Sequence, residues 1–303
     1  MKKIMLLFVA LATTLSTAMA ATEPAPSLVT KSFTYKDFTM LSVSNSFQVK
    51  LTFAESYSIE VEVPGYLEPY LKVSCMSNKL RIGLNKLPKD IQKKLNHDGD
   101  QLHAWITMPA LTALSMSGAT KLETIGKPRL GPDSSLSIEL SGASKIDRLE
   151  ADGTGRIVVD MSGASKAELQ AAFHIMDIEV SGASKLKMEG GADKVTVDCS
   201  GASNCRFAGD YGSLKAEVSG ASKMEVDGDV HSLVTDISGS SRIEVDGVTD
   251  KAEMELSGAS KATLTVQESL LYELSGVSTL RLRDLGAKVR GEIGRGSKIE
   301  YLK

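Results

Sequence analysis

The sequence predicts an all-β fold, a single-stranded parallel β-helix (a solenoid) with about 19 residues per coil. A Ser-Gly-Ala-Ser-Lys segment recurs ten times, complete or altered, and its copies follow one another at a nearly constant interval after two longer first steps. The residues immediately before and after each copy are apolar in every case. Repeats of this length are typical of solenoids, and the alternation of apolar and polar residues makes each repeat a β coil.

Each copy of the segment predicts a tight corner between two strands. The copies begin at Ser117, Ser141, Ser162, Ser181, Ser200, Ser219, Ser238, Ser257, Ser275 and Gly294. Glycine and alanine suit a bend between stacked backbones, where a bulky side chain has no room. We expect the serines to form hydrogen bonds from coil to coil or to the backbone at the bend.

Charged columns flank the predicted corner. An acidic residue stands two positions before nine of the ten copies: Glu139, Asp160, Glu179, Asp198, Glu217, Asp236, Glu255, Glu273 and Glu292. A basic residue ends eight of the ten copies: Lys121, Lys145, Lys166, Lys185, Lys223, Arg242, Lys261 and Lys298. We expect the two ladders to compensate each other partly, although exposed ion pairs contribute only ~0–1 kcal/mol each.

The first twenty residues predict a signal peptide (1–20) that is cleaved after Ala20. Lys2 and Lys3 precede a short apolar run, and small residues surround the cleavage site. A flexible leader (21–30) follows. The mature chain is therefore expected in the periplasm or on the outer cell surface, and no later stretch is apolar and long enough to span a membrane.

Residues 31–114 predict a β-rich part that continues or caps the solenoid, and residues 115–303 hold the β-helix repeats. The expected strands are Phe33 to Val43, Phe47 to Phe53, Tyr57 to Val63, Leu80 to Leu84 and Leu102 to Met108. A helical turn is expected at Tyr66 to Leu71 and a short helix at Lys89 to Leu95. The last copy and the tail Tyr301 to Lys303 are expected to close the far end, because a solenoid must cover its terminal core.

Composition limits the possible partners. The formal net charge is −3 and becomes −5 without Lys2 and Lys3. This mild acidic excess argues against nucleic acid as a partner. Aromatic residues make up 5% of the chain, so no stacking platform is obvious.

Two of the three cysteines fall in the inward columns. Cys199 and Cys205 flank one corner, where other coils have apolar residues, and Cys75 lies in the N-terminal part. The pattern favours buried thiols. A disulfide between Cys199 and Cys205 stays open as an alternative in an oxidising compartment.

The ordered set of segments resembles a bacterial family, the putative auto-transporter adhesin, head GIN domain, which is a domain of unknown function. The resemblance rests on Leu41-Ser-Val-Ser-Asn-Ser-Phe-Gln-Val-Lys-Leu51, Tyr57-Ser-Ile-Glu-Val61, Leu80-Arg-Ile-Gly-Leu84, Met108-Pro-Ala-Leu-Thr-Ala-Leu-Ser-Met-Ser-Gly-Ala119 and the repeated corners. It implies a right-handed parallel β-helix and brings no catalytic residues.

Candidate chemical sites are weighed against structural explanations. In each corner the lysine lies four residues after the first serine, whereas serine–lysine hydrolases use a spacing of three. A catalytic site also occurs once, not ten times. The acidic column lacks the Gly- and Asp-rich repeat of calcium-binding β-rolls. His97-Asp-Gly-Asp100 together with His103 is a candidate surface metal site, but the Asp-Gly pair is a turn signal and favours a structural turn. The sequence thus predicts no catalytic, metal or cofactor site.

We interpret the chain as an exported, non-enzymatic binding module, an adhesin for an unknown protein or glycan at the cell envelope. The alternatives are a polysaccharide-active enzyme and a purely structural spacer. A binding module should show an exposed patch that breaks the repeat, expected near Asn85 to Gln101. An enzyme should show a groove with converging carboxylates and a positive charge.

Overall fold

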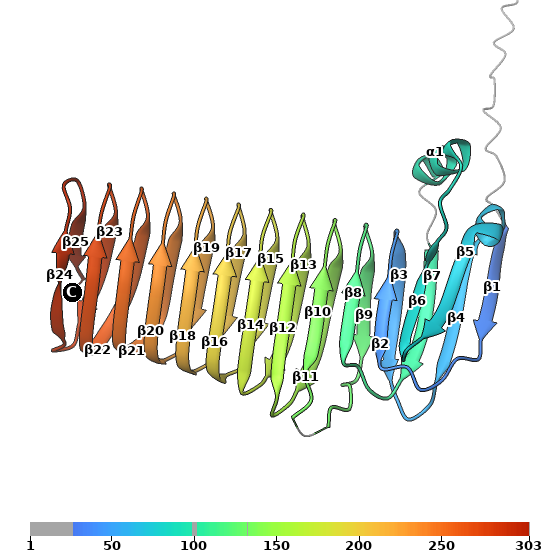
Figure 1. The fold of residues 1–303 in the computed structure, drawn as a ribbon, viewed down its shortest axis with the longest axis horizontal. Helices are drawn as coiled ribbons and strands as arrows, with labels where there is room; N and C mark the ends of the chain where they lie inside the picture. Colours follow the sequence, from blue (N-terminus) through green and yellow to red (C-terminus); the bar gives the residue numbers. More distant parts are fainter. Residues whose placement is uncertain (1–26, 99–101, 132, 303) are drawn as a thin grey trace, which may run out of the picture.

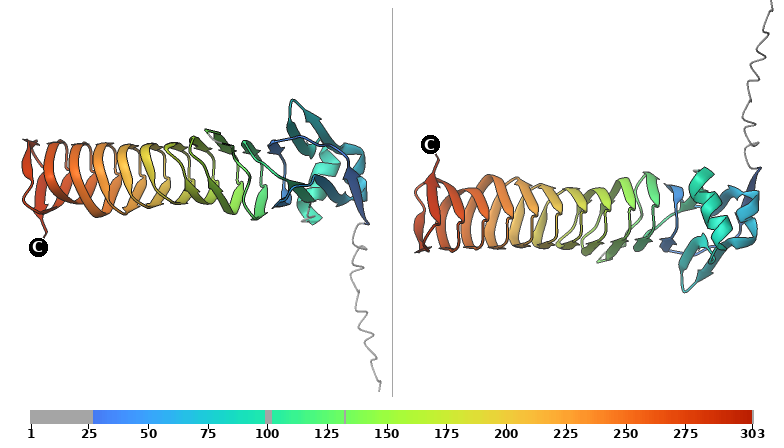
Figure 2. Two further views of the ribbon diagram at one scale, coloured as in Figure 1. Left: turned by 90° about the horizontal axis from the view of Figure 1, so that it is seen from below. Right: turned by 90° about the horizontal axis from the view of Figure 1, so that it is seen from above.

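The protein is a rod of stacked β coils with a mixed β-structure at its N-terminal end (Figures 1 and 2). The computed structural model describes residues 27–98, 102–131 and 133–302. The expected signal peptide lies outside the described residues. The prediction of a β-solenoid with coils about 19 residues apart is confirmed. Within the described part, no helix is long and apolar enough to cross a membrane.

Each coil has two strands, and successive coils stack these strands into two faces. Face A contains the strands that precede the corners, paired parallel in the order β6 (Lys79–Leu84), β2 (Met40–Val43), β8 (Ala113–Met116), β10 (Leu136–Leu140), β12 (Arg156–Met161), β14 (Ile175–Val180), β16 (Ala192–Cys199), β18 (Tyr211–Val218), β20 (Val230–Ile237), the ends of β21 (Arg242–Leu256) and β22 (Lys261–Leu274), and β24 (Lys288–Ile293).

Face B contains the strands that follow the corners. Its parallel order is β7 (Leu102–Met108), β3 (Phe47–Phe53), β9 (Lys121–Ile125), β11 (Lys145–Asp152), β13 (Lys166–Ala172), β15 (Lys185–Glu189), β17 (Asn204–Ala208), β19 (Lys223–Asp227), the starts of β21 and β22, β23 (Thr279–Asp284) and β25 (Lys298–Tyr301). A second bend, opposite the corner, leads from face B to the next strand of face A.

The two inward columns form the core between the faces, as predicted. From Met116 to Leu274 the residue before each corner is at most 2% exposed, and so is the residue after it from Leu122 to Leu280. Burial of such side chains contributes roughly 1.5–3 kcal/mol for each large one. The repetition of these columns therefore holds the coils together.

The corners stack backbone on backbone. The amide of Ala202 donates to the carbonyl oxygen of Gly182 over 2.7 Å, and the same bond recurs from coil to coil. The second serine of the corner is buried in every copy from Ser144 to Ser278. In two early corners, Ser144 and Ser165, its hydroxyl donates to the backbone oxygen three residues earlier, each over 2.8 Å. The expected role of these serines at the bend is confirmed there.

The two charged ladders do not pair with each other, so that expectation is wrong. The acidic column lies on the outer surface of face A and the basic column on that of face B. Four corner lysines, Lys145, Lys166, Lys223 and Lys298, instead bind acids two positions further along their own strand. Lys166 and Glu168 are 2.8 Å apart, and Lys298 and Glu300 are 2.6 Å apart.

The N-terminal coils are not stacked in sequence order. Strand β2 lies between β6 and β8, and β3 lies between β7 and β9. The coil β2–β3 is therefore enclosed by two coils that follow it in the chain. Helix α1 (Lys89–Asp98) takes the place of a corner between β6 and β7, which extends the short helix expected at this insertion.

Antiparallel strands continue both faces beyond the first coil. Strand β4 (Ser58–Pro64) pairs with β7, and β1 (Leu28–Phe33) pairs with β4. Strand β5 (Leu71–Met76), which the sequence did not predict, pairs with β6 after the 3₁₀ turn η1 (Gly65–Tyr70). β1 begins at Leu28, inside the range expected to be a leader.

The described residues leave the C-terminal end uncovered, contrary to expectation. Ile293 is 50% exposed and Tyr301 is 63% exposed, although both stand in inward columns. The last coil has the composition of an interior coil, and its side chains do not fold over the core.

Candidate functional site

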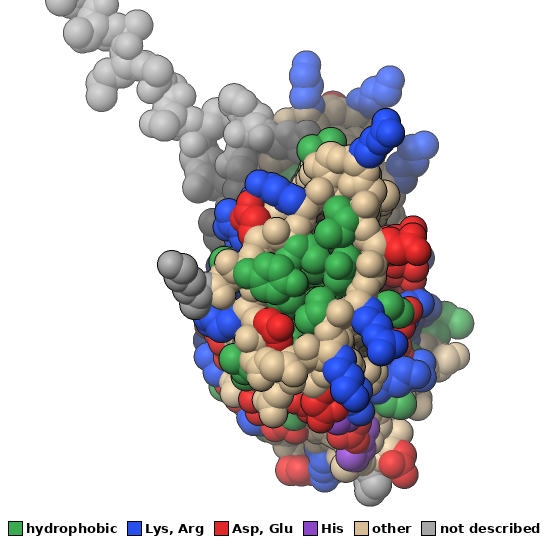
Figure 3. All heavy atoms as spheres, turned by 90° about the vertical axis from the view of Figure 1, so that its left-hand side faces the viewer, with side chains coloured by type: hydrophobic (Ala, Val, Ile, Leu, Met, Phe, Trp, Pro, Cys, Tyr) green, Lys and Arg blue, Asp and Glu red, His purple; other side chains and the backbone are tan. Residues whose placement is uncertain are grey.

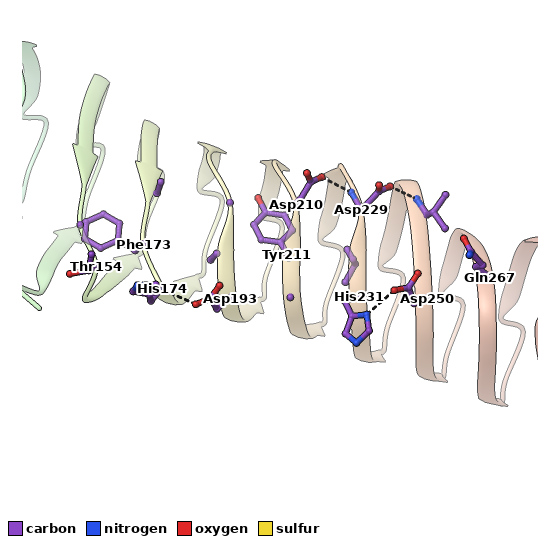
Figure 4. Close-up of a pocket in the computed structure, with 17 residues that line it drawn as sticks. Thr154, Phe173, His174, Asp193, Asp210, Tyr211, Asp229, His231, Asp250 and Gln267 are labelled. Atoms are coloured by element: carbon purple, nitrogen blue, oxygen red, sulfur yellow. Dashed lines mark hydrogen bonds and ion pairs between the residues drawn. The ribbon is translucent and has the colours of Figure 1, made fainter.

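A groove runs along the second bend of seven successive coils, on the edge of the rod opposite the corners (Figure 4). Its volume is about 780 Å³. We call it the second-bend groove. Its polar and aromatic lining is Thr154, Phe173, His174, Asp193, Asp210, Tyr211, Asp229, His231, Asp250 and Gln267.

Two histidine–aspartate pairs lie in one column of the groove. His174 Nδ1 is 2.6 Å from Asp193 Oδ2, and His231 Nδ1 is 2.7 Å from Asp250 Oδ2. A carboxylate only accepts hydrogen bonds, so Nδ1 carries the proton, and Nε2 of a neutral ring becomes an acceptor. Each pair thus joins adjacent coils and offers acceptor atoms at the surface.

A single glycine separates the two pairs. The strand register places Gly212 between Asp193 and His231 in the same column. A Cβ atom at Gly212 would lie 2.7 Å from the carbonyl oxygen of Asp193, so the backbones approach too closely for a side chain. The surface therefore stays open between the two pairs.

Two further carboxylates form a ladder beside this column. Asp210 Oδ1 accepts from the amide of Asp229 over 3.0 Å, and Asp229 Oδ1 accepts from the amide of Val248 over 2.8 Å. These bonds fix each carboxylate through one oxygen. The second oxygen of each has no other hydrogen bond among the described residues, so it can serve a ligand.

Tyr211 is the unusual residue of the groove. Its side chain lines the groove, yet the residue is only 3% exposed, and its hydroxyl has no hydrogen-bond partner within the described residues. Burial, and secondarily the charge of Asp210, raise the pKa of the phenol well above its usual range. Tyr211 is therefore a neutral hydroxyl, and leaving it unsatisfied costs about 1–3 kcal/mol.

The groove is rich in acceptors and poor in cations. Its four aspartates carry a charge of −4 with both histidines neutral, and no lysine or arginine is among the described residues that line it. No group of three metal-binding side chains occurs in the described part. The arrangement suits a ligand that donates hydrogen bonds along its length.

The residues that sequence reasoning weighed lie elsewhere. The corner serines are on the opposite edge of the rod. Asn85 to Gln101 is only partly described, and its exposed Lys86, Lys89, Lys93 and Lys94 form a separate basic patch around the start of α1. Nothing is described of the His97 or Asp100 side chains. His103 stacks on Trp105, with ring centroids 5.5 Å apart.

Cys199 and Cys205 lie where their register predicts, whereas Cys75 is more exposed than expected. Cys199 and Cys205 are fully buried, and their Sγ atoms are 2.8 Å apart as free thiols. The hydrogen bond between the Cys205 and Cys199 thiols, followed by burial, raises the pKa of Cys205. Cys75 is partly exposed.

Sequence reasoning missed the groove although a signal existed. His174 and His231 both stand seven residues before the corner that follows them, three coils apart. The columns next to the corners define the repeat, and this shared position lies outside them.

One comparison with known proteins identifies a family. A family model described as "Putative auto-transporter adhesin, head GIN domain" matches residues 37–208 and 174–283. A search of curated proteins gives no match.

Three of the similar solved structures are crystal structures of a "putative adhesin". The one from Parabacteroides distasonis is 14% identical, with a TM-score of 0.49, and the match covers 91% of this chain and 98% of that chain. The one from Parabacteroides merdae is 17% identical, with a TM-score of 0.43, covering 91% and 96%. The one from Bacteroides fragilis is 15% identical, with a TM-score of 0.40, covering 92% and 99%.

Proposed function

The chain belongs to the putative auto-transporter adhesin, head GIN domain family, and from this membership we propose that it is a non-enzymatic binding module of the bacterial cell envelope. Its signal peptide (1–20) directs export and is removed after Ala20. The second-bend groove is its ligand-binding surface. Residues 31–114 cap the rod, and residues 115–303 present the groove along it.

The observation that carries this proposal is the cluster of four aspartates and two histidines that lines the groove. Hydrogen bonds to histidine rings or to backbone amides hold the four carboxylates in fixed positions. The stacking of the coils does not require these side chains. A spacer has no use for such a cluster.

A glycan chain is the ligand class that fits this groove. All coil backbones at the second bend pair with neighbouring coils, so an extended peptide finds no free strand edge there. Recognition must come from the side chains of Asp193, Asp210, Asp229 and Asp250, which accept hydrogen bonds. Sugar hydroxyl and amino groups donate such bonds at many positions along a chain.

A polysaccharide-active enzyme is the competing function, because carboxylates do gather in the groove. Such enzymes place one carboxylic acid and one carboxylate across the scissile bond. Here Asp210 and Asp229 are tied to the backbone, and Asp193 and Asp250 are tied to histidines. The expected positive charge is also missing from the described lining. The geometry favours binding over cleavage.

The test is an array of neutral and amino-sugar oligosaccharides probed with the mature chain and two double variants. Asp193→Asn with Asp250→Asn removes two groove charges. Asp160→Asn with Asp198→Asn removes two charges from the outer surface of face A and serves as the matched control. We expect the groove variant to lose about tenfold in affinity, roughly 1.4 kcal/mol, and the control to bind as before.

Three results would contradict the proposal. Equal binding by both variants would show that the groove does not bind the oligosaccharide. Release of reducing sugar ends would show that the chain is a polysaccharide-cleaving enzyme. Binding of basic peptides that disappears at high salt would indicate an electrostatic protein partner, because salt screens exposed charges over about 10 Å at 0.1 M.

The location has a separate test. Protease treatment of intact cells should degrade a module displayed on the outer surface. Complete protection of the chain, together with degradation after the envelope is opened, would place it in the periplasm and refute a role in adhesion.

A further inference from the structure

The C-terminal end of the rod exposes the core of the solenoid. Ile293 is 50% exposed, whereas Leu274 in the same column of the preceding coil is 1% exposed. Tyr301 is 63% exposed, whereas Leu282 beneath it is fully buried. Figure 3 shows the resulting apolar patch end-on, with charged side chains around its border. Uncovered patches of this kind mark interaction surfaces.

The same end presents two open strand edges. Within the described residues, β24 pairs only with β22, and β25 pairs only with β23. Their outer backbone groups are ready to pair with another chain. The N-terminal end differs, because β4, β1 and β5 continue its faces in antiparallel fashion. It therefore offers no pair of parallel edges on which a further coil could stack.

We propose that a second copy of this chain covers this end in a two-fold symmetric dimer, with β24 of each copy paired antiparallel to β25 of the other. The chain reverses direction at the corner 294–297, between the two strands. A two-fold axis parallel to the strands therefore places β24 of each copy against β25 of the other copy, and the paired strands run in opposite directions. The contact is isologous and closes on itself.

The charges on the two strands select one register. The outward side chains are Arg290 and Glu292 on β24 and Lys298 and Glu300 on β25, as their strand partners in the preceding coils define. In the selected register, Glu292 lies opposite Lys298 of the partner subunit, and Arg290 lies opposite Glu300 of the partner subunit. Symmetry doubles both contacts. A shift by two residues would instead oppose Glu292 to the partner's Glu300, which is unfavourable.

The inward side chains complement each other in the same register. Gly291 lies opposite the partner's Ile299, and Val289 lies opposite the partner's Tyr301. A small residue thus faces a large one in each pair, as in a packed core. The dimer buries the apolar columns that each copy leaves exposed, and assembly stops there because a two-fold contact closes on itself.

Sedimentation analysis of the mature chain tests the dimer with a charge exchange. Glu292→Lys places two lysines opposite each other at both symmetric contacts, and Lys298→Glu does the same with two glutamates. We expect the wild-type chain to dimerise and each variant alone to dimerise about tenfold more weakly or not at all. An equimolar mixture of the two variants restores opposite charges at both contacts and should form a heterodimer.

Glu273→Lys is the matched control, because Glu273 occupies the same column one coil inside the rod. It should dimerise like the wild type. Circular dichroism of every variant reports whether the fold is retained. A wild-type chain that stays monomeric at all concentrations would overturn the proposal. So would a Glu292→Lys variant that dimerises normally, or a variant mixture that stays monomeric.

Discussion

Gly220 lies directly on Gly201 of the preceding coil, with φ of +75°. A Cβ atom added to Gly220 would be 2.5 Å from the carbonyl oxygen of Gly201. That oxygen already accepts the amide of Ala221 over 2.8 Å. The corner therefore needs glycine for two reasons, the left-handed backbone and the absence of space.

Gly220→Ala should destabilise the rod by about 1–3 kcal/mol from backbone strain alone. The close contact with Gly201 should increase this loss. Ala221→Ser is the matched control, since the corner at Ser238 naturally carries Ser240 at that position. Urea unfolding followed by circular dichroism measures both. Equal midpoints for Gly220→Ala and the wild type would contradict this account of the corner.

Tyr211→Phe should stabilise the fold by about 1 kcal/mol, because it removes a buried hydroxyl that has no partner among the described residues. Tyr272→Phe, at a partly exposed tyrosine outside the groove, should change stability by less than about 0.5 kcal/mol. Urea unfolding measures both variants. A loss of stability in Tyr211→Phe would show that the hydroxyl has a partner.

Cys199 and Cys205 should resist alkylation in the folded, pre-reduced chain at pH 8. Both are fully buried, and the raised pKa of Cys205 disfavours its reactive thiolate. The partly exposed Cys75 is the internal control and should react first. Mass spectrometry after iodoacetamide treatment, with and without urea, measures this difference. Equal labelling of all three cysteines in the folded chain would refute it.

Glu168→Gln should cost less than about 1 kcal/mol at pH 7, because its ion pair with Lys166 is exposed. The hydrogen bond and charge of Lys166 lower the pKa of Glu168. A lowered folded pKa contributes stability above the unfolded pKa, and this contribution is lost as the pH falls through the folded pKa. The difference between variant and wild type should therefore vanish in acid.

Glu179→Gln is the control for this prediction, since Glu179 has no ion pair among the described residues. It should leave stability unchanged at both pH values. The Glu168→Gln effect should also shrink in 1 M salt. Persistence of a large effect in acid would show that packing, not charge, holds Glu168.

The repeat allowed most of the rod to be predicted from the sequence. A column such as Met116, Leu140 and Met161 indicates which side chains face inward, because successive side chains of a strand point to opposite sides. The pairing of the charged ladders could not be read in this way. Spacing brings Glu179 near Lys185 along the chain, but the corner turns them onto opposite faces.

The repeat did not allow the N-terminal coils or the groove to be predicted. The enclosure of β2 between β6 and β8 depends on partners that no local pattern names. Tyr211 looks like an ordinary core residue in sequence, and only its surroundings show that its hydroxyl lacks a partner within the described residues. The open end at Tyr301 was unpredictable for a similar reason, since the last coil has the composition of an interior coil.

The enclosed coil at the N-terminal end also constrains how the chain can fold. Met40 pairs with Ala113 only after the chain has passed through β3 to β7, whereas Ile175 pairs with Lys194 in the very next coil. Closing the longer loop costs roughly 1 kcal/mol more in chain entropy. We therefore expect slow nucleation at the N-terminal end, followed by rapid addition of coils toward the C-terminus.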